Sequence, residues 1–191
     1  MYKLSAGYRE TKIFALEKVA QERSAQNEKG LDSTNARPQF CSMKKALIYS
    51  FGTGLGTGFS PVAPGTAGST LAVLVAYFLF RGNQTYLLLS LLVCLPLGIG
   101  AASWMADQLR IPDPSIVVID EVVGMWVALL GVAWNWKLFA LAFVLFRLFD
   151  VVKPPPVRQL ESLHGGLGIM LDDVMAGFYA LVAVHLIGLL F

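Results

Sequence analysis

GNQTYLLLSLLVCLPLGIGAASWMA, residues 82–106, contains no charged side chain and decides the fold of this chain. A helix needs about 20 predominantly apolar residues to cross the hydrocarbon core of a bilayer. This run is long enough to do so, and residues 46–80 before it are also uncharged. The pattern predicts an all-α protein whose helices pass through a membrane several times, that is, a polytopic helical membrane protein.

The charged residues are concentrated at the N-terminus. Of the 191 residues, 55% are hydrophobic and only 15% are charged, whereas soluble domains carry about a quarter charged residues. Residues 1–42 hold a large share of these charges, and we interpret them as a polar N-terminal extension before a membrane domain at 43–191. Because Met43-Lys44-Lys45 directly precedes an apolar run, a mis-called start is an equal alternative for residues 1–42.

Composition excludes several classes of protein and site. The net charge of +2 arises entirely within residues 1–42, so the remaining chain offers no basic face for nucleic acid. Two cysteines are too few for a disulfide framework, and no Cys or His spacing typical of a zinc site occurs.

Five apolar stretches are predicted to span the membrane: residues 66–80, 85–106, 117–136, 138–152 and 172–191. Between residues 52 and 66, glycine and proline interrupt the apolar pattern, and both disfavour a regular helix. We expect residues 46–59 to form a short, re-entrant or broken segment, because irregular backbone at membrane depth must be buried in protein or face a watery cavity. Several of the five stretches are short, so buried core helices remain an alternative for them.

If successive spans cross the membrane in opposite directions, three polar loops lie on the same side: residues 60–66, 107–120 and 150–173. Basic residues are more numerous on this side than on the other. They are Lys44, Lys45, Arg110, Lys153 and Arg158, against Arg81 and Lys137. Because cytoplasmic loops are enriched in lysine and arginine, the three loops are predicted to face the cytoplasm.

Five carboxylates lie at predicted span boundaries on this same side: Asp120, Glu121, Asp150, Asp172 and Asp173. Ionisable residues at the membrane are costly and by default suggest function, and converging negative charges would repel without a cation between them. Mg²⁺ favours carboxylate oxygens, retained water and substrate phosphate, so all five are candidate Mg²⁺ ligands and catalytic acids. The alternative is solvated helix ends paired with basic residues, since Arg147 shares a helix face with Asp150.

A candidate phosphate site accompanies these acids. Arg147 could hold a phosphate through its planar fork and Lys153 as a point charge. The loop that contains Ser60, Gly65 and Thr66 could assist them. Alternatively, the basic residues anchor helix ends at the cytoplasmic surface, and the glycines serve tight helix packing.

The residues favour metal-activated water over a covalent phosphoenzyme. A cysteine phosphatase needs an arginine six residues after its nucleophile, but Leu47 follows Cys41 at that spacing and Gly100 follows Cys94. The DxDx(T/V) pattern of aspartyl-phosphate enzymes is also absent. Activated water is the simplest remaining route, with His164 or a water giving a proton to the leaving oxygen. Spacing leaves open which carboxylate is the general base.

Four motifs occur in order: SPVAPGTAGS at 60–69, IDEVVGMW at 119–126, FRLFDVVKPPPVR at 146–158 and HGGLGIMLDDVMAG at 164–177. Together they resemble the phosphatidylglycerophosphatase A family. The resemblance implies an all-helical enzyme of the bacterial inner membrane that hydrolyses phosphatidylglycerophosphate to phosphatidylglycerol and inorganic phosphate with Mg²⁺. Residues 43–191 would then be a membrane phosphatase domain, and residues 1–42 lie outside the resemblance.

Two other functions fit parts of the pattern. A small ion or proton transporter also has intramembrane acids and a broken helix, but it predicts acids in mid-span and an internal repeat. Another lipid enzyme, a phosphatidyltransferase for CDP-alcohols, would carry DGxxAR…GxxxDxxxD, which this chain lacks. A lipid phosphatase is therefore the preferred prediction.

Overall fold

The computed structural model describes residue 18, residues 37–155, residue 157 and residues 165–189. Within these residues all regular structure is helical, which confirms the all-α prediction. In chain order the elements are α2 (Arg37–Gly52), the 3₁₀ helix η1 (Thr57–Phe59), α3 (Pro64–Leu74), the π-helical segment η2 (Val75–Leu79), α4 (Gln84–Leu109), α5 (Ile119–Ala128), α6 (Trp136–Val152) and α8 (Gly166–Gly188).

The chain divides into two compact units, Met1–Ile48 and Tyr49–Phe191. Helix α2 crosses this division, and all the elements from η1 onward belong to the second unit. Every predicted site residue also falls within the second unit. The predicted division between residues 42 and 43 stays a prediction.

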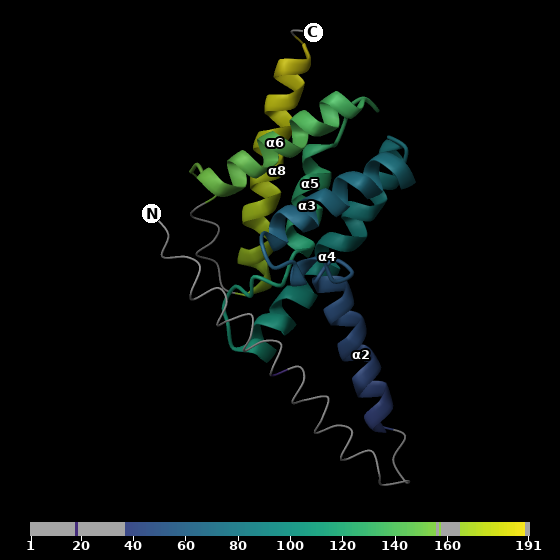
Figure 1. The fold of residues 1–191 in the computed structure, drawn as a ribbon, viewed down its shortest axis with the longest axis vertical. Helices are drawn as coiled ribbons and strands as arrows, with labels where there is room; N and C mark the ends of the chain where they lie inside the picture. The colour runs from purple at the N-terminus through teal and green to yellow at the C-terminus, as the bar shows by residue number, and fades with distance from the viewer. Residues whose placement is uncertain (1–17, 19–36, 156, 158–164, 190–191) are drawn as a thin grey trace. The chain divides into compact units, whose positions relative to one another are not determined.

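Helix α5 lies at the centre of the second unit (Figure 1) and packs against α3, α4, α6 and α8. Its side chains are buried almost throughout. Glycines allow the closest approach, since a Cβ on Gly124 of α5 would overlap the carbonyl oxygen of Asp173 on α8. A Cβ on Gly177 of α8 would likewise overlap the carbonyl oxygen of Gly124. This small-residue contact, common between membrane helices, determines where α8 crosses α5.

The span predicted at residues 117–136 is wrong in its extent, because α5 ends at Ala128 and a turn follows. Gly131 adopts a φ of 72° in this turn, a conformation that glycine reaches without strain. Gln84 holds the turn from α4, accepting from the Gly131 N–H at 3.0 Å and donating to the Val132 carbonyl at 3.2 Å. With 10 residues, the helix α5 alone is shorter than the about 20 residues of a regular bilayer-crossing helix, and the turn after it continues the chain as far as Gln84 at the start of α4.

Helix α8 begins earlier than the span predicted at residues 172–191. It starts at Gly166, so Asp172 and Asp173 lie inside the helix and not at its end. Gly165 enters the helix with a φ of 73°, and the Gly166 N–H donates to Ser103 Oγ on α4 at 2.9 Å. Because a Cβ on Gly166 would overlap the α4 backbone, glycine permits this start.

Among the described residues, two helices, α4 and α8, are long and apolar enough to cross a membrane, judged by length and composition. A shorter apolar helix, Pro64–Leu79, combines α3 and η2. Helix α6 covers the predicted stretch 138–152. The structure therefore supports membrane helices, and the number of five spans stays a prediction.

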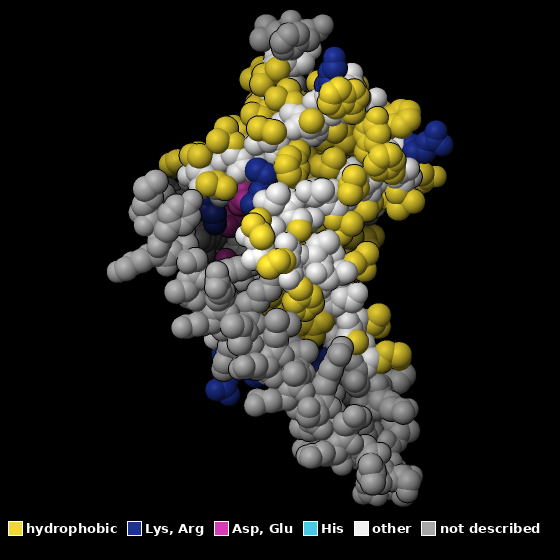
Figure 2. All heavy atoms as spheres, viewed as in Figure 1, with side chains coloured by type: hydrophobic (Ala, Val, Ile, Leu, Met, Phe, Trp, Pro, Cys, Tyr) yellow, Lys and Arg dark blue, Asp and Glu magenta, His cyan; other side chains and the backbone are white. Residues whose placement is uncertain are grey.

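Large apolar side chains are exposed on the outer faces of η2, α4, α6 and α8 (Figure 2), among them Phe78, Leu92 and Leu186. At the turns before α4 and α6, Arg81 lies over the Trp134 ring at 5.8 Å. At the start of α6, Lys137 lies over the Trp136 ring at 5.9 Å. Tryptophan beside basic side chains is typical of a membrane–water interface. This exposed apolar surface of the described helices suits contact with lipid.

Candidate active site

Asp120 and Glu121 occupy the first turn of α5. The helix begins after Val118, whose N–H donates to the Gly52 carbonyl at 2.9 Å and whose carbonyl accepts from the Val122 N–H at 3.1 Å. Carboxylates in a first turn are favoured by the partial positive charge of the helix N-terminus. The charge of the helix N-terminus therefore favours two adjacent acids in the first turn of α5.

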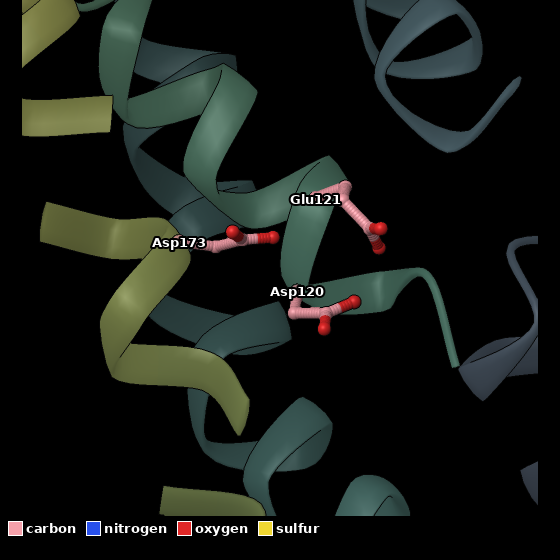
Figure 3. A group of neighbouring side chains, drawn as sticks. All are labelled: Asp120, Glu121 and Asp173. Atoms are coloured by element: carbon pink, nitrogen blue, oxygen red, sulfur yellow. The ribbon is translucent and has the colours of Figure 1, made fainter. Parts of the chain in front are cut away.

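Asp173 reaches the same place from α8, where the Gly124–Gly177 contact brings the two helices together. Figure 3 shows the side chains of Asp120, Glu121 and Asp173 close to one another, from α5 and α8. Each offers a carboxylate oxygen, and these oxygens all lie within 4.8 Å of one another. Asp120 is only 8% exposed and Asp173 only 4%. The three form what we call the acidic cluster.

The acidic cluster has the properties of a cation site. Among the described residues, nothing hydrogen-bonds to Asp120 Oδ1 or Glu121 Oε2, and both atoms are buried. Burial first, and then the charge of Glu121, raises the pKa of Asp120 well above its usual range. Burial also raises the pKa of Glu121, and the nearby Arg147 opposes that rise. A divalent cation would satisfy the buried oxygens and offset the repulsion, so the donor set could hold a metal ion.

The other two predicted acids lie beside the cluster in ion pairs. Asp150 accepts from Arg147 Nη1 at 2.8 Å, which confirms the expected contact between these two residues of α6. Asp172 accepts from Lys153 Nζ at 2.9 Å, and its Oδ1 also accepts from the Asp173 N–H at 3.0 Å. Asp150 acts electrostatically on both Glu121 and Asp173. Both pairs therefore border the cluster.

The N-terminal turn of α3 completes the site. A Cβ on Gly65 would overlap Glu121 Oε1 and would lie 3.2 Å from Arg147 Nη1. Arg147 Nη1 also lies 3.5 Å from Ser69 Oγ, to which it donates. Helix N-termini carry N–H groups without intrahelical partners and attract anions. The acidic cluster, an arginine and a helix N-terminus thus meet in one place.

The remaining predicted residues have different positions. Thr66 lies in the first turn of α3, where its carbonyl accepts from the Thr70 hydroxyl at 2.7 Å. Ser60 follows η1, and its N–H donates to the Thr57 carbonyl at 2.9 Å. His164 and Arg158 lie outside the described residues. The roles assigned to all of these residues stay predictions.

Two residues near the site were missed from the sequence. Ser69 accepts from Arg147, and Asp113 acts electrostatically on Asp120 and Asp172. Ser69 ends the motif SPVAPGTAGS, which was the available signal for it. Asp113 lies in the polar loop between α4 and α5, and nothing in its local sequence distinguishes it from a solvated loop acid.

Phosphoryl transfer needs positioned cations, cationic side chains and backbone N–H groups around the phosphate, more than it needs covalent chemistry from the protein. The acidic cluster could hold the cation, Arg147 is a cationic side chain, and the N-terminus of α3 offers backbone N–H groups. The class that this fold and site define is therefore that of helical phosphohydrolases with an apolar outer surface.

The chain belongs to the phosphatidylglycerophosphatase A family, whose sequence model matches residues 50–188. It is 37% identical over 139 residues to phosphatidylglycerophosphatase A of Escherichia coli, covering 71% of this chain and 80% of the relative. The Haemophilus influenzae protein of that name is 36% identical over 146 residues, covering 73% and 88%. A Bacteroides thetaiotaomicron protein, provisionally named a phosphatidylinositol-3-phosphatase, is 46% identical over 158 residues, covering 78% and 94%. No solved structure gives a significant match.

Proposed function

We propose that this chain hydrolyses phosphatidylglycerophosphate to phosphatidylglycerol and inorganic phosphate at the cytoplasmic face of a bacterial inner membrane. The observation that carries the proposal is the meeting of the acidic cluster with Arg147 and the N-terminus of α3. All four sequence motifs contribute to this meeting, through Gly65, Glu121, Arg147 and Asp173. Membership of the phosphatidylglycerophosphatase A family supports the choice of substrate.

The acidic cluster would hold Mg²⁺, with Asp150 and Asp172 bordering it. A bound Mg²⁺ supplies charge neutralisation, polarises a phosphoryl oxygen and makes water a better nucleophile. The protein's own part is to keep the carboxylates together before the ion arrives. The backbone contact at Gly124 and the hydrogen bond from the Asp173 N–H to Asp172 both serve this purpose.

The substrate phosphate would lie between Arg147 and the first turn of α3. Arginine matches a phosphate through two parallel N–H groups. The salt bridge to Asp150 and the hydrogen bond to Ser69 orient the guanidinium in advance. Gly65 keeps this space free of a side chain, and Lys153 adds positive charge from the end of α6, where it pairs with Asp172.

In the hydrolytic step the oxygen of a water forms a bond to phosphorus, and the bond from phosphorus to the glycerol oxygen breaks. A carboxylate at the site accepts the water proton. The glycerol oxygen leaves as an alkoxide and takes a proton from water or from His164. Arg147 stabilises the negative charge on the transferring phosphoryl group.

A second candidate substrate is phosphatidylinositol 3-phosphate. The Bacteroides thetaiotaomicron relative matches the chain over more residues and at higher identity than the other two relatives described above. Both lipids present a phosphomonoester on a polar headgroup, so the same acidic cluster and Arg147 would serve either one.

The test is phosphate release by the purified protein from each of the two lipids, with Mg²⁺ and with a chelator. We expect Mg²⁺-dependent release from phosphatidylglycerophosphate, with the higher kcat/KM on this lipid. Higher kcat/KM on the inositol lipid would make the second candidate the function. Absence of release from both lipids would refute the proposal.

A further inference from the structure

An apolar groove of about 410 Å³ lies between α3–η2 and α6. One wall includes Thr70, Leu74 and Phe78, and the other includes Trp136, Ala140 and Val144. Almost the whole lining is hydrocarbon or aromatic ring, and the Thr70 hydroxyl already donates to the Thr66 carbonyl. A groove of this size and lining suits an apolar ligand and offers little to a polar one.

One end of the groove adjoins the candidate active site. Thr70 lies one helical turn after Thr66, at the start of α3. Val144 lies three residues before Arg147, so the two share a face of α6. Arg147 in turn contacts Ser69, the neighbour of Thr70. Both walls therefore lead to the elements that form the proposed phosphate site.

The opposite end of the groove is lined by Tyr77 and Trp136. There the Trp134 indole N–H donates to the Tyr77 carbonyl at 3.2 Å, and Lys137 lies over the Trp136 ring. Thr70 and Tyr77 are separated by roughly 10 Å along the helix, at 1.5 Å per residue. The groove thus extends from the phosphate site to the aromatic side chains of Tyr77 and Trp136.

We propose that this groove holds one acyl chain of the lipid substrate. The inference rests on the proposed function, because a phosphorylated lipid carries its phosphate and its acyl chains on one molecule. A site that takes the phosphate needs an apolar path that begins beside it, and this groove begins one helical turn from Arg147. Two small exposed side chains, Thr70 and Ala140, keep the groove open.

The groove can be filled without touching the acids or Arg147. Ala140→Trp adds a large side chain at an exposed position of the lining, so the fold should tolerate it. Val93→Trp is the matched control, because Val93 is an exposed apolar residue of α4 outside the lining. The kcat and KM of each are measured in the same detergent on dioleoyl and dibutyryl forms of phosphatidylglycerophosphate.

Each methylene that moves from water into an apolar site contributes about a fourfold gain in binding, so a long chain gains most from the groove. Ala140→Trp should raise KM for the dioleoyl substrate at least tenfold, and should change KM for the dibutyryl substrate less than twofold. Val93→Trp should change neither. Equal loss on both substrates, or an unchanged KM on both, would overturn the proposal.

A second measurement does not depend on turnover. Phosphatidylglycerol with a diazirine near the end of one chain should label the α6 peptide around Ala140 in the unmodified protein and in Val93→Trp. In Ala140→Trp this labelling should be lost. Labelling without phosphatase activity would keep the groove assignment and refute the proposed function, whereas activity without labelling at the groove would refute the groove alone. A dimer that Ala140→Trp converts to a monomer would assign the groove to a contact between copies instead.

Discussion

Gly65 lies so close to Glu121 that a Cβ on the glycine would overlap the carboxylate oxygen Oε1. The two residues are far apart in the sequence, and they join the N-terminus of α3 to the N-terminus of α5. Arg147 of α6 lies against the same point. A residue with no side chain is therefore placed where a cation-binding carboxylate and a phosphate-binding arginine come together.

Replacing Gly65 with alanine should damage catalysis more than stability. The added methyl must displace either the Glu121 carboxylate or the Arg147 guanidinium, and overpacking of this kind costs about 1–3 kcal/mol. We expect kcat/KM to fall about tenfold or more, with the protein still inserted and extractable. The control is Gly100→Ala, because a Cβ at Gly100 would meet nothing within 4 Å. Gly56 also has open space around it, but its φ of 97° would strain an alanine. Full activity in Gly65→Ala would show that the active site does not require a glycine at this position.

Neutralising a member of the acidic cluster should abolish turnover. Asp120→Asn and Asp173→Asn remove charge at nearly constant shape, and a lost metal ligand costs several kcal/mol of transition-state stabilisation. We expect turnover to fall about a thousandfold. The matched control is Asp107→Asn, an exposed aspartate of α4, which should stay near wild type. Turnover is measured over a range of Mg²⁺ concentrations. The metal site is contradicted if both variants keep more than a tenth of wild-type activity and their Mg²⁺ dependence is unchanged.

Arg147→Lys should lower activity although it preserves the charge. Lysine cannot reproduce the planar fork, and hydrogen bonds to charged groups contribute about 1.5–3 kcal/mol. The expected loss in kcat/KM is therefore about ten- to a hundredfold. Arg110→Lys at the exposed end of α4 tests whether any arginine replacement has this effect. Equal activity of the Arg147 and Arg110 variants would leave Arg147 as a helix-end anchor.

Gly124→Ala should destabilise the fold by separating α5 from α8. Its Cβ would overlap the Asp173 carbonyl oxygen and the Phe146 ring, and overpacking costs about 1–3 kcal/mol. Gly100→Ala in α4 should be neutral or stabilising, because alanine favours helix by about 1 kcal/mol over glycine and its Cβ meets open space. Thermal unfolding in detergent compares the two. A Tm for Gly124→Ala at or above that of Gly100→Ala would contradict the close-contact interpretation.

The orientation in the membrane can be tested with single cysteines in a background in which Cys41 and Cys94 are replaced by serine. Ser115→Cys, in the loop between α4 and α5, should be protected from an impermeant thiol reagent in intact cells. Lys137→Cys, at the start of α6, should react. Both positions are exposed in the structure, so accessibility to the reagent reports the side of the membrane. Reaction at Ser115→Cys and protection at Lys137→Cys would reverse the proposed topology.

The sequence alone determined the all-helical fold and the family, and it predicted the acids and the arginine of the candidate site, although it missed Ser69 and Asp113. Apolar runs such as 82–106 need only composition and length to be recognised, and the contact between Arg147 and Asp150 needs only the spacing of one helix turn. These features depend on residues near one another in the chain. The absence of charge also distinguishes the apolar runs 46–80 and 82–106 from the segments that carry the acids.

Helix ends and the grouping of the acids were decided by the tertiary structure. The local pattern gives Asp120, Glu121, Asp150, Asp172 and Asp173 equal standing, but only the crossing of α5 and α8 separates the acidic cluster from the two ion-paired acids. That crossing depends on Gly124 meeting Gly177, and the end of α5 depends on Gln84 of α4 bonding to Gly131. Contacts of this kind join residues distant in sequence, and no local periodicity records them, because they arise only when the helices pack.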